Sequence, residues 1–331
     1  MNNKKTNEWG SLSKGYFVKR QVWDVVFKFC RAILLFGLCF LILQPILDKL
    51  SVSFMEEQDL YDGTVISIPS NFTLGNYNLV GRLLNYWPSL FQTLLIVLVS
   101  AFLQISACAL AAYGFARYKF PLKNFWFMCV MLIIVVPPQT IMSSLYLNFR
   151  FFDVFGLFRL IGGEPVNLLN SFGGYLLLSA TGMGLKSGLY IFMLRQYFRG
   201  VPKELEEAAW VDGCGKFKTF IRIMVPDAMP MLTSCLLFSF VWQWTDSLFS
   251  TLFLNNYQML SIGLGNLYER ARRWWMVMSG GSSDSYTLAP LAFLQQMNAT
   301  GVLMCLAPMV LLYLVAQKAF VESLSQTGIK M

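Results

Sequence analysis

Long apolar runs separated by short polar stretches make up most of the chain. The runs lie at about 25–47, 88–115, 124–149, 172–194, 229–254 and 289–317. A helix needs about 20 residues to cross the hydrocarbon core of a bilayer, and each run reaches that length. The apolar positions are continuous rather than alternating, which favours helices over the strands of a barrel. The pattern predicts an all-α polytopic membrane protein with six transmembrane helices.

Composition and charge agree with a membrane protein and indicate its orientation. The chain is 56% hydrophobic and 13% charged, whereas soluble proteins carry about 25% charged residues. Most of its 26 lysines and arginines lie in residues 4–31, between the second and third runs, in residues 195–228 and in the tail. Because cytoplasmic loops are enriched in basic residues, both termini are expected to be cytoplasmic. The net charge of +8 is therefore assigned to topology rather than to nucleic-acid binding.

The chain is predicted to divide into a cytoplasmic segment, residues 1–24, and a transmembrane domain, residues 25–331. A signal peptide is the alternative interpretation of the first apolar run. The long polar region before that run, and the lack of a small-residue cleavage site, favour a helix that is retained.

The polar stretch 195–228 between the fourth and fifth runs predicts a cytoplasmic loop of two short helices. Pro202 suits the first position of a helix, and the glutamates at 204, 206 and 207 would fall in the first two turns, where the helix dipole favours them. Gly213 and Gly215 predict the end of this helix, and a second helix at about 216–224 would lead into the fifth span. Such an elbow could pass a push from a soluble partner into the membrane. The alternative is an ordinary charged loop.

Several motifs in the chain resemble those of a known family. The Glu-Ala-Ala triplet at 207–209, a glycine four residues later and an isoleucine ten residues further on resemble the EAA loop of bacterial ABC import permeases. Segments 69–77, 111–121, 194–198, 240–246 and 320–330 are similar to the permeases of carbohydrate importers of the maltose-transporter type, over about residues 25–331. Two departures are Val225, where leucine is usual, and Thr245, where asparagine is usual.

The resemblance implies a role for the loop and a set of partners. The residues that would couple to an ATPase are Glu207, Ala208, Ala209, Gly213, Ile223 and Pro226. The implied partners are a second homologous permease subunit, two ATPase subunits that bind ATP and Mg, and an extracellular solute-binding lipoprotein or periplasmic protein. The implied substrate is a sugar, expected to be an oligosaccharide, and the implied location is the bacterial inner or plasma membrane. A permease for a peptide, a polyamine or another solute is the alternative within the same class.

Polar and aromatic residues in or near the spans are candidates for a substrate path. They are Lys186, Tyr190, Trp242, Gln243, Trp244 and Asp246. Aromatic rings stack on sugar rings, amides bond to hydroxyl groups, and ionisable residues in spans usually face the protein interior or a water-filled path. An interfacial aromatic belt or helix packing explains the same residues without a substrate.

The residue content argues against an enzyme. The chain has no histidine, which removes histidine acid–base chemistry and most zinc sites. Residues 182–187 resemble a phosphate-binding loop, but Leu185 separates the last glycine from Lys186, whereas the motif needs glycine directly before lysine. ATP hydrolysis is therefore expected on another chain, and no catalytic, cofactor or metal residues are predicted here. A membrane-embedded enzyme would need a polar catalytic cluster that the runs do not supply.

Overall fold

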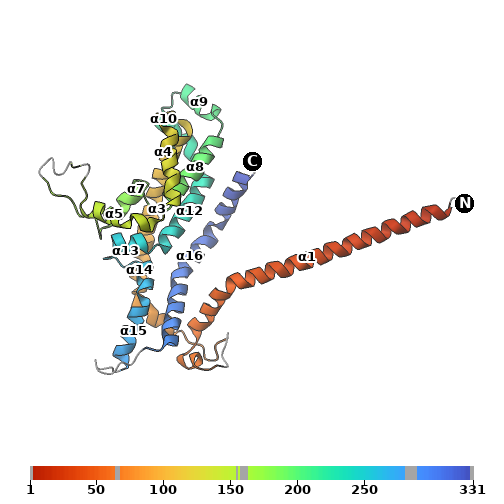
Figure 1. The fold of residues 1–331 in the computed structure, drawn as a ribbon, viewed down its shortest axis with the longest axis horizontal. Coiled ribbons are helices and arrows are strands. Elements are labelled where there is room, and N and C mark those ends of the chain that lie inside the picture. The colour runs from red at the N-terminus through yellow and green to blue at the C-terminus, as the bar shows by residue number, and fades with distance from the viewer. Residues whose placement is uncertain (1–2, 64–67, 154–155, 157–162, 280–288, 329–331) are drawn as a thin grey trace. The chain divides into compact units, whose positions relative to one another are not determined.

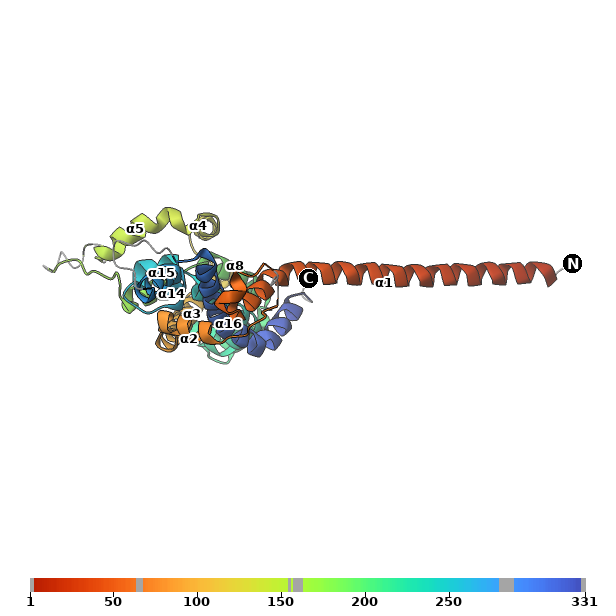
Figure 2. The same ribbon diagram turned by 90° about the horizontal axis from the view of Figure 1, so that it is seen from below.

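The computed structural model is built of helices joined by short connections (Figures 1 and 2). It describes residues 3–63, 68–153, 156, 163–279 and 289–328, with side chains from residue 23 to residue 318 inside these ranges. Within these ranges there is no β-strand, and the extended pairings are two isolated bridges, Met55 with Phe72 and Phe152 with Val166. The all-α prediction is confirmed. The chain forms two compact units, residues 1–74 and 75–331.

The first unit is one long helix followed by a short folded-back segment. Helix α1 (Asn3–Phe54) begins inside the polar segment predicted for residues 1–24, so most of that segment is helical. Its part from Trp23 onward is apolar on all sides and exposed, as expected for a helix that meets lipid or another chain. After the helix, the buried carboxylate of Asp59 accepts hydrogen bonds from the backbone N–H and the side-chain amide of Asn71 at 2.8 and 3.0 Å.

The second unit is a helical bundle centred on α3 (Tyr86–Arg117), which packs against α7, α8 and α12. Outside these, α16 packs against α12, α2 and α15.

The elements that follow α1 are, in chain order, η1 (Glu57–Leu60, in the first unit), α2 (Gly75–Leu84), α3 (Tyr86–Arg117), α4 (Lys123–Val135), α5 (Pro138–Arg150), α7 (Phe172–Ala180), α8 (Ser187–Gly200), α9 (Glu204–Val211), α10 (Lys216–Thr219), η2 (Phe220–Met224), α11 (Val225–Asp227), α12 (Met229–Thr245), α13 (Leu248–Leu254), α14 (Leu260–Gly265), α15 (Leu267–Met278) and α16 (Leu291–Gly328). Figure 1 shows α9 and α10 at one end of this bundle and α15 at the other.

Some of the predicted spans are single helices and others are broken. Among the described residues, three helices are long and apolar enough to cross a membrane, namely Trp23–Phe54, Tyr86–Arg117 and Leu291–Lys318. Two bent pairs meet the same criteria when each is counted as one span, Lys123–Val135 with Pro138–Arg150 and Lys216–Asp227 with Met229–Thr245.

The breaks have local causes in the sequence. At Pro137-Pro138 the axes of α4 and α5 differ by 108°, so that Figure 2 shows α4 end-on and α5 lengthwise. The predicted run 172–194 is two helices, α7 and α8, because Gly182 and Lys186 adopt positive φ angles of 69° and 62° between them. The predicted run 229–254 is broken at Asp246, whose carboxylate accepts hydrogen bonds from the N–H groups that begin α13.

The C-terminal motif predicted at 320–330 falls in and beyond the last turns of α16, which ends at Gly328. The side chains of that motif lie outside the described residues.

Candidate functional site

The predicted elbow begins with α9, a helix of eight residues. Lys203 caps it, and the Lys203 carbonyl accepts hydrogen bonds from the N–H groups of Glu206 and Glu207, both at 3.0 Å. The three glutamates occupy the first turn, as predicted. Pro202, however, precedes the cap instead of taking the first helical position, because the helix begins two residues later than expected.

Gly213 ends α9 through a left-handed backbone turn. Its φ is +79°, a conformation that costs other residues about 1–2 kcal/mol. The Gly213 N–H donates to the carbonyl of Trp210 at 3.0 Å, and the Cys214 N–H donates to that of Ala209 at 2.9 Å. Gly213 therefore acts as the helix stop that the sequence predicts, whereas Gly215 has a φ of −69° and caps α10.

The two faces of α9 have different surroundings. Glu207 and Ala208 are exposed, while Ala209 is buried. Glu206 is only 3% exposed and points into the bundle. The part of the elbow that a partner could touch is therefore the face with Glu207 and Ala208.

A buried ion pair fixes the inner face of α9 to the end of α3. The Nε of Arg117 lies 3.1 Å from Oε2 of Glu206, with the two side chains 8% and 4% exposed. The hydroxyl of Tyr113 donates to Oε1 of Glu206 at 2.7 Å, and Nη2 of Arg117 donates to the carbonyl of Val201 at 2.6 Å. This anchor was not predicted from the sequence. A helix turns about 100° per residue, so Glu206 and Glu207 must face different ways, and this spacing is the signal that could have indicated an inward-facing glutamate.

The second half of the elbow continues into α12. Helix α10, the π-helical turn η2 and α11 run together and meet α12 at an angle of 80°. The ring of Phe220 in η2 lies 4.9 Å from the ring of Tyr113 and 6.3 Å from the ring of Phe198 in α8, measured between centroids. Of the predicted coupling residues in this half, Ile223 is half-buried and Pro226 is exposed.

A further contact connects the elbow to α8. The hydroxyl of Tyr197 donates to the carbonyl of Asp227 at 2.7 Å. Burial and the neighbouring Asp227 carboxylate raise the pKa of Tyr197. The elbow thus contacts α3, α8 and α12 through buried or hydrogen-bonded side chains, so a displacement of α9 acts on all three helices.

The predicted path residues divide into an exposed pair and a buried set. Nζ of Lys186 lies 4.9 Å from the centroid of the Trp242 ring, and both side chains are exposed. Tyr190 is fully buried among α3, α8 and α12, and Asp246 is buried with its carboxylate accepting hydrogen bonds from the N–H groups of Leu248 and Ser250 in α13. Of these four residues, only Lys186 and Trp242 are exposed.

Gln243 belongs to a buried polar network that joins three helices. Its Nε2 donates to Oε1 of Gln104 in α3 at 2.7 Å and to the hydroxyl of Ser239 at 2.9 Å, and Oε1 of Gln243 accepts from Ser100. Gln104 in turn donates to the hydroxyl of Ser187 in α8 at 2.7 Å. Gln104 was missed as a site residue, although an amide inside an apolar run is a recognisable signal.

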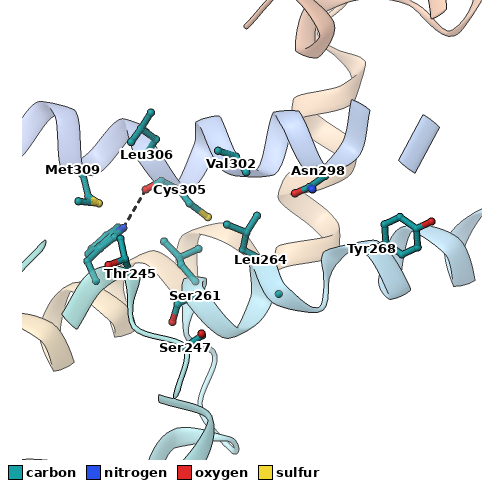
Figure 3. Close-up of a pocket in the computed structure, with 13 residues that line it drawn as sticks. Thr245, Ser247, Ser261, Leu264, Tyr268, Asn298, Val302, Cys305, Leu306 and Met309 are labelled. Carbon is teal, nitrogen blue, oxygen red and sulfur yellow. Dashed lines mark hydrogen bonds between the residues drawn. The ribbon is translucent and has the colours of Figure 1, made fainter. Parts of the chain in front are cut away.

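Trp244 faces a separate cavity of about 540 Å³ between α12, α14 and α16 (Figure 3). The indole Nε1 donates to the carbonyl of Cys305 at 3.2 Å. Thr245, Tyr268 and Asn298 also line the cavity, and Ser261 places there a buried hydroxyl that has no hydrogen-bond partner among the described residues. Most of the lining surface is apolar, with Leu264, Val302 and Met309 among its residues. The rings and hydroxyl groups placed among them are groups that bind a ligand with hydroxyl groups of its own.

Residues 104–324 match the family described as binding-protein-dependent transport system inner membrane component. The matched region includes the elbow, the Gln104 network and the cavity. The chain belongs to this family. As an inner membrane component of a transport system, it has long apolar helices for which a bilayer is the expected surrounding.

Individual relatives of this transport component extend the match. It is 30% identical to the osmoprotective compounds uptake permease protein GgtD of Synechocystis sp., over 71% of this chain and 74% of that protein. It is 26% identical to the arabinooligosaccharides transport system permease protein AraQ of Halalkalibacterium halodurans, over 88% and 93%. A chain in the crystal structure of a bacterial ABC transporter involved in alginate import has the same fold, with a TM-score of 0.67, 19% identity, and coverage of 90% of this chain and 97% of that one.

Proposed function

We propose that the chain is a permease subunit of an ATP-driven ABC importer and forms half of the translocation pathway for a sugar, expected to be an oligosaccharide. The observation that carries the proposal is the elbow. Helix α9 exposes Glu207 and Ala208, and its opposite face is fixed by the buried pair of Glu206 and Arg117. A surface that is both accessible and rigidly attached to membrane helices is what a coupling element needs.

The contacts of the elbow with α3, α8 and α12 explain how a movement of the ATPase subunits would be transmitted into the membrane. Closure of the two ATPase subunits on ATP would displace α9. The displacement would reach α3 through Glu206 and α8 through Tyr197, and it would reach α12 directly through η2 and α11. Since α3, α8 and α12 also share the Gln104 network, they would move as a group and change the side of the membrane to which the path is open.

The topology that fits this mechanism has six spans with both termini in the cytoplasm. In this topology the single helices Trp23–Phe54, Tyr86–Arg117 and Leu291–Lys318 would form the first, second and sixth spans. The bent pair α4 and α5 would form the third span, α7 and α8 the fourth, and α12, which follows the elbow, the fifth. The elbow then lies in the cytoplasm between spans four and five. The concentration of basic residues on that side supports this orientation.

The proposed assembly contains a second homologous permease, two ATPase subunits and an extracellular binding protein. The relative named for arabinooligosaccharide transport supports a sugar as the solute. The exposed Lys186–Trp242 pair and the hydroxyl groups of the cavity are the surfaces offered to it. The relative named for osmoprotective compounds favours a second candidate, a small compatible solute in place of an oligosaccharide.

Site-specific photo-crosslinking tests the coupling face. A photoreactive residue at Ala208 in the assembled importer should crosslink to the ATPase subunit. The matched control is the same residue at Tyr268, an exposed position on α15 at the opposite end of the bundle. Capture of the ATPase from position 268, or no capture from position 208, would remove the elbow from the coupling role.

Direct binding to the cognate solute-binding protein decides between the two solutes. Titration calorimetry with arabinose or glucose oligosaccharides and with small compatible solutes should give saturable binding of an oligosaccharide. Binding of a compatible solute alone would assign the chain to the second candidate.

A further inference from the structure

Beside the elbow, three cations from two helices gather around one turn of the chain. Lys123 is the first residue of α4, and Arg195 and Arg199 lie on the last two turns of α8. Nζ of Lys123 donates to the carbonyl of Tyr118 at 2.8 Å. Nε of Arg195 donates to the carbonyl of Phe115 at 3.4 Å, so carbonyl oxygens of the 115–118 turn hold both cations.

These cations repel one another, and no carboxylate among the described side chains forms an ion pair with them. Burial and the charges of Arg195 and Arg199 lower the pKa of Lys123. Burial and the charge of Arg199 lower the pKa of Arg195. The guanidinium of Arg195 is further held 3.8 Å from the centroid of the Phe127 ring. A bound anion would relieve this repulsion.

The surface next to the cations is apolar and aromatic. Leu122, Phe125 and Trp126 are 68%, 49% and 52% exposed. Exposed tryptophan and phenylalanine beside lysine and arginine is the composition of surfaces that sit at the boundary of lipid headgroups and acyl chains. These exposed apolar side chains favour a phospholipid as the anion, because its acyl chains would cover them while its headgroup phosphate binds the cations.

We propose that Lys123, Arg195 and Arg199 bind the phosphate of an anionic phospholipid, whose acyl chains lie along Leu122, Phe125 and Trp126. The site is directly connected to the elbow, because Nζ of Lys216 in α10 lies 5.4 Å from the centroid of the Tyr118 ring. Its placement in the cytoplasmic leaflet rests on the proposed function. The lipid contact itself does not, and it can be measured without any transport.

Fluorescence quenching by brominated lipids provides the test. The assembled importer is reconstituted in phosphatidylcholine vesicles, and brominated phosphatidylglycerol or brominated phosphatidylcholine is added at equal mole fractions. The difference in quenching between wild type and Trp126→Phe isolates the signal of Trp126. This signal should respond more strongly to phosphatidylglycerol, and the apparent affinity should fall roughly fivefold for each cation removed in Lys123→Gln and Lys123→Gln/Arg195→Gln.

Two variants control for charge and folding. Lys123→Arg keeps the charge and should keep the preference. Arg272→Gln/Arg273→Gln removes two cations from α15 at the other end of the bundle and should also keep it. Equal quenching by the two lipids, or an unchanged preference in the double variant at 123 and 195, would overturn the proposal. So would loss of the preference on adding inorganic phosphate, which would indicate a free anion.

Discussion

At the scale of single residues, two neighbouring glutamates in α9 have opposite roles. Glu207 faces outward, and Glu206 is buried against Arg117 and Tyr113. Motif spacing predicts that the first faces a partner, and the structure shows that it is exposed. Motif spacing could not identify the second, because the partner of Glu206 lies about 90 residues earlier in the chain, and a sequence does not show which distant residues meet.

Glu206→Gln tests the buried anchor. Removing one member of a buried pair leaves the other charge uncompensated, and we expect a loss of about 3 kcal/mol in stability. The apparent melting temperature of the purified importer and its ATP-driven uptake should both fall. Glu204→Gln, a change of the same kind at an exposed position of the same turn, should leave the melting temperature unchanged. Equal melting temperatures for the two variants would show that the pair does not hold the elbow.

Gln243→Met tests the polar network in the bundle. The change keeps the volume but removes hydrogen bonds to Gln104, Ser239 and Ser100. Hydrogen bonds between membrane helices average about 0.6 kcal/mol each, so a loss of roughly 1–2 kcal/mol is expected in unfolding by denaturing detergent. Thr245→Val is the control, since the Thr245 hydroxyl bonds only within its own helix. A loss in the control as large as that in Gln243→Met would contradict a special role for the network.

At the scale of elements, the hydrophobic pattern predicted the helical class, which the structure confirms. The six spans stay a prediction, since three single helices and two bent pairs among the described residues meet the criteria for crossing a membrane. The hydrophobic pattern did not predict the breaks. A run of apolar residues has the same composition whether the helix is straight or broken, so the gap between α7 and α8 became visible only through the positive φ angles of Gly182 and Lys186. The break at Pro137-Pro138 can be predicted from the sequence, because two consecutive prolines remove two backbone donors. The single prolines at 45 and 308, in contrast, lie inside the continuous helices α1 and α16.

The end of α9 gives a prediction at this scale. Gly213→Ala places a side chain at a φ of +79°, and no atom lies within 4 Å of the added carbon, so backbone strain of about 1–2 kcal/mol is the whole effect. Gly215→Ala has the same open space but a negative φ. ATP-driven uptake should decrease in Gly213→Ala and stay near wild type in Gly215→Ala. The reverse order would show that the left-handed turn does not set the position of the elbow.

At the scale of the whole molecule, the two units of the chain differ in how much of their apolar surface is buried within the unit. Residues 75–331 contain a packed core, the elbow and the cavity. In the first unit, α1 exposes its apolar side chains from Trp23 onward, which a bilayer or a partner subunit would cover. The solute could not be predicted from the sequence beyond a class, because the motif that carries the resemblance is the loop expected to contact the ATPase, and its spacing holds no information about a solute.

The central claim is that energy from a partner ATPase enters through the exposed face of α9. The most direct measurement is ATP-driven uptake of the solute by the reconstituted importer carrying Glu207→Lys, compared with Glu269→Lys at an exposed position of α15, at the other end of the bundle. Both variants should assemble in the membrane. We expect uptake to be abolished in Glu207→Lys and largely retained in Glu269→Lys. Uptake at the wild-type rate by assembled Glu207→Lys would contradict the claim.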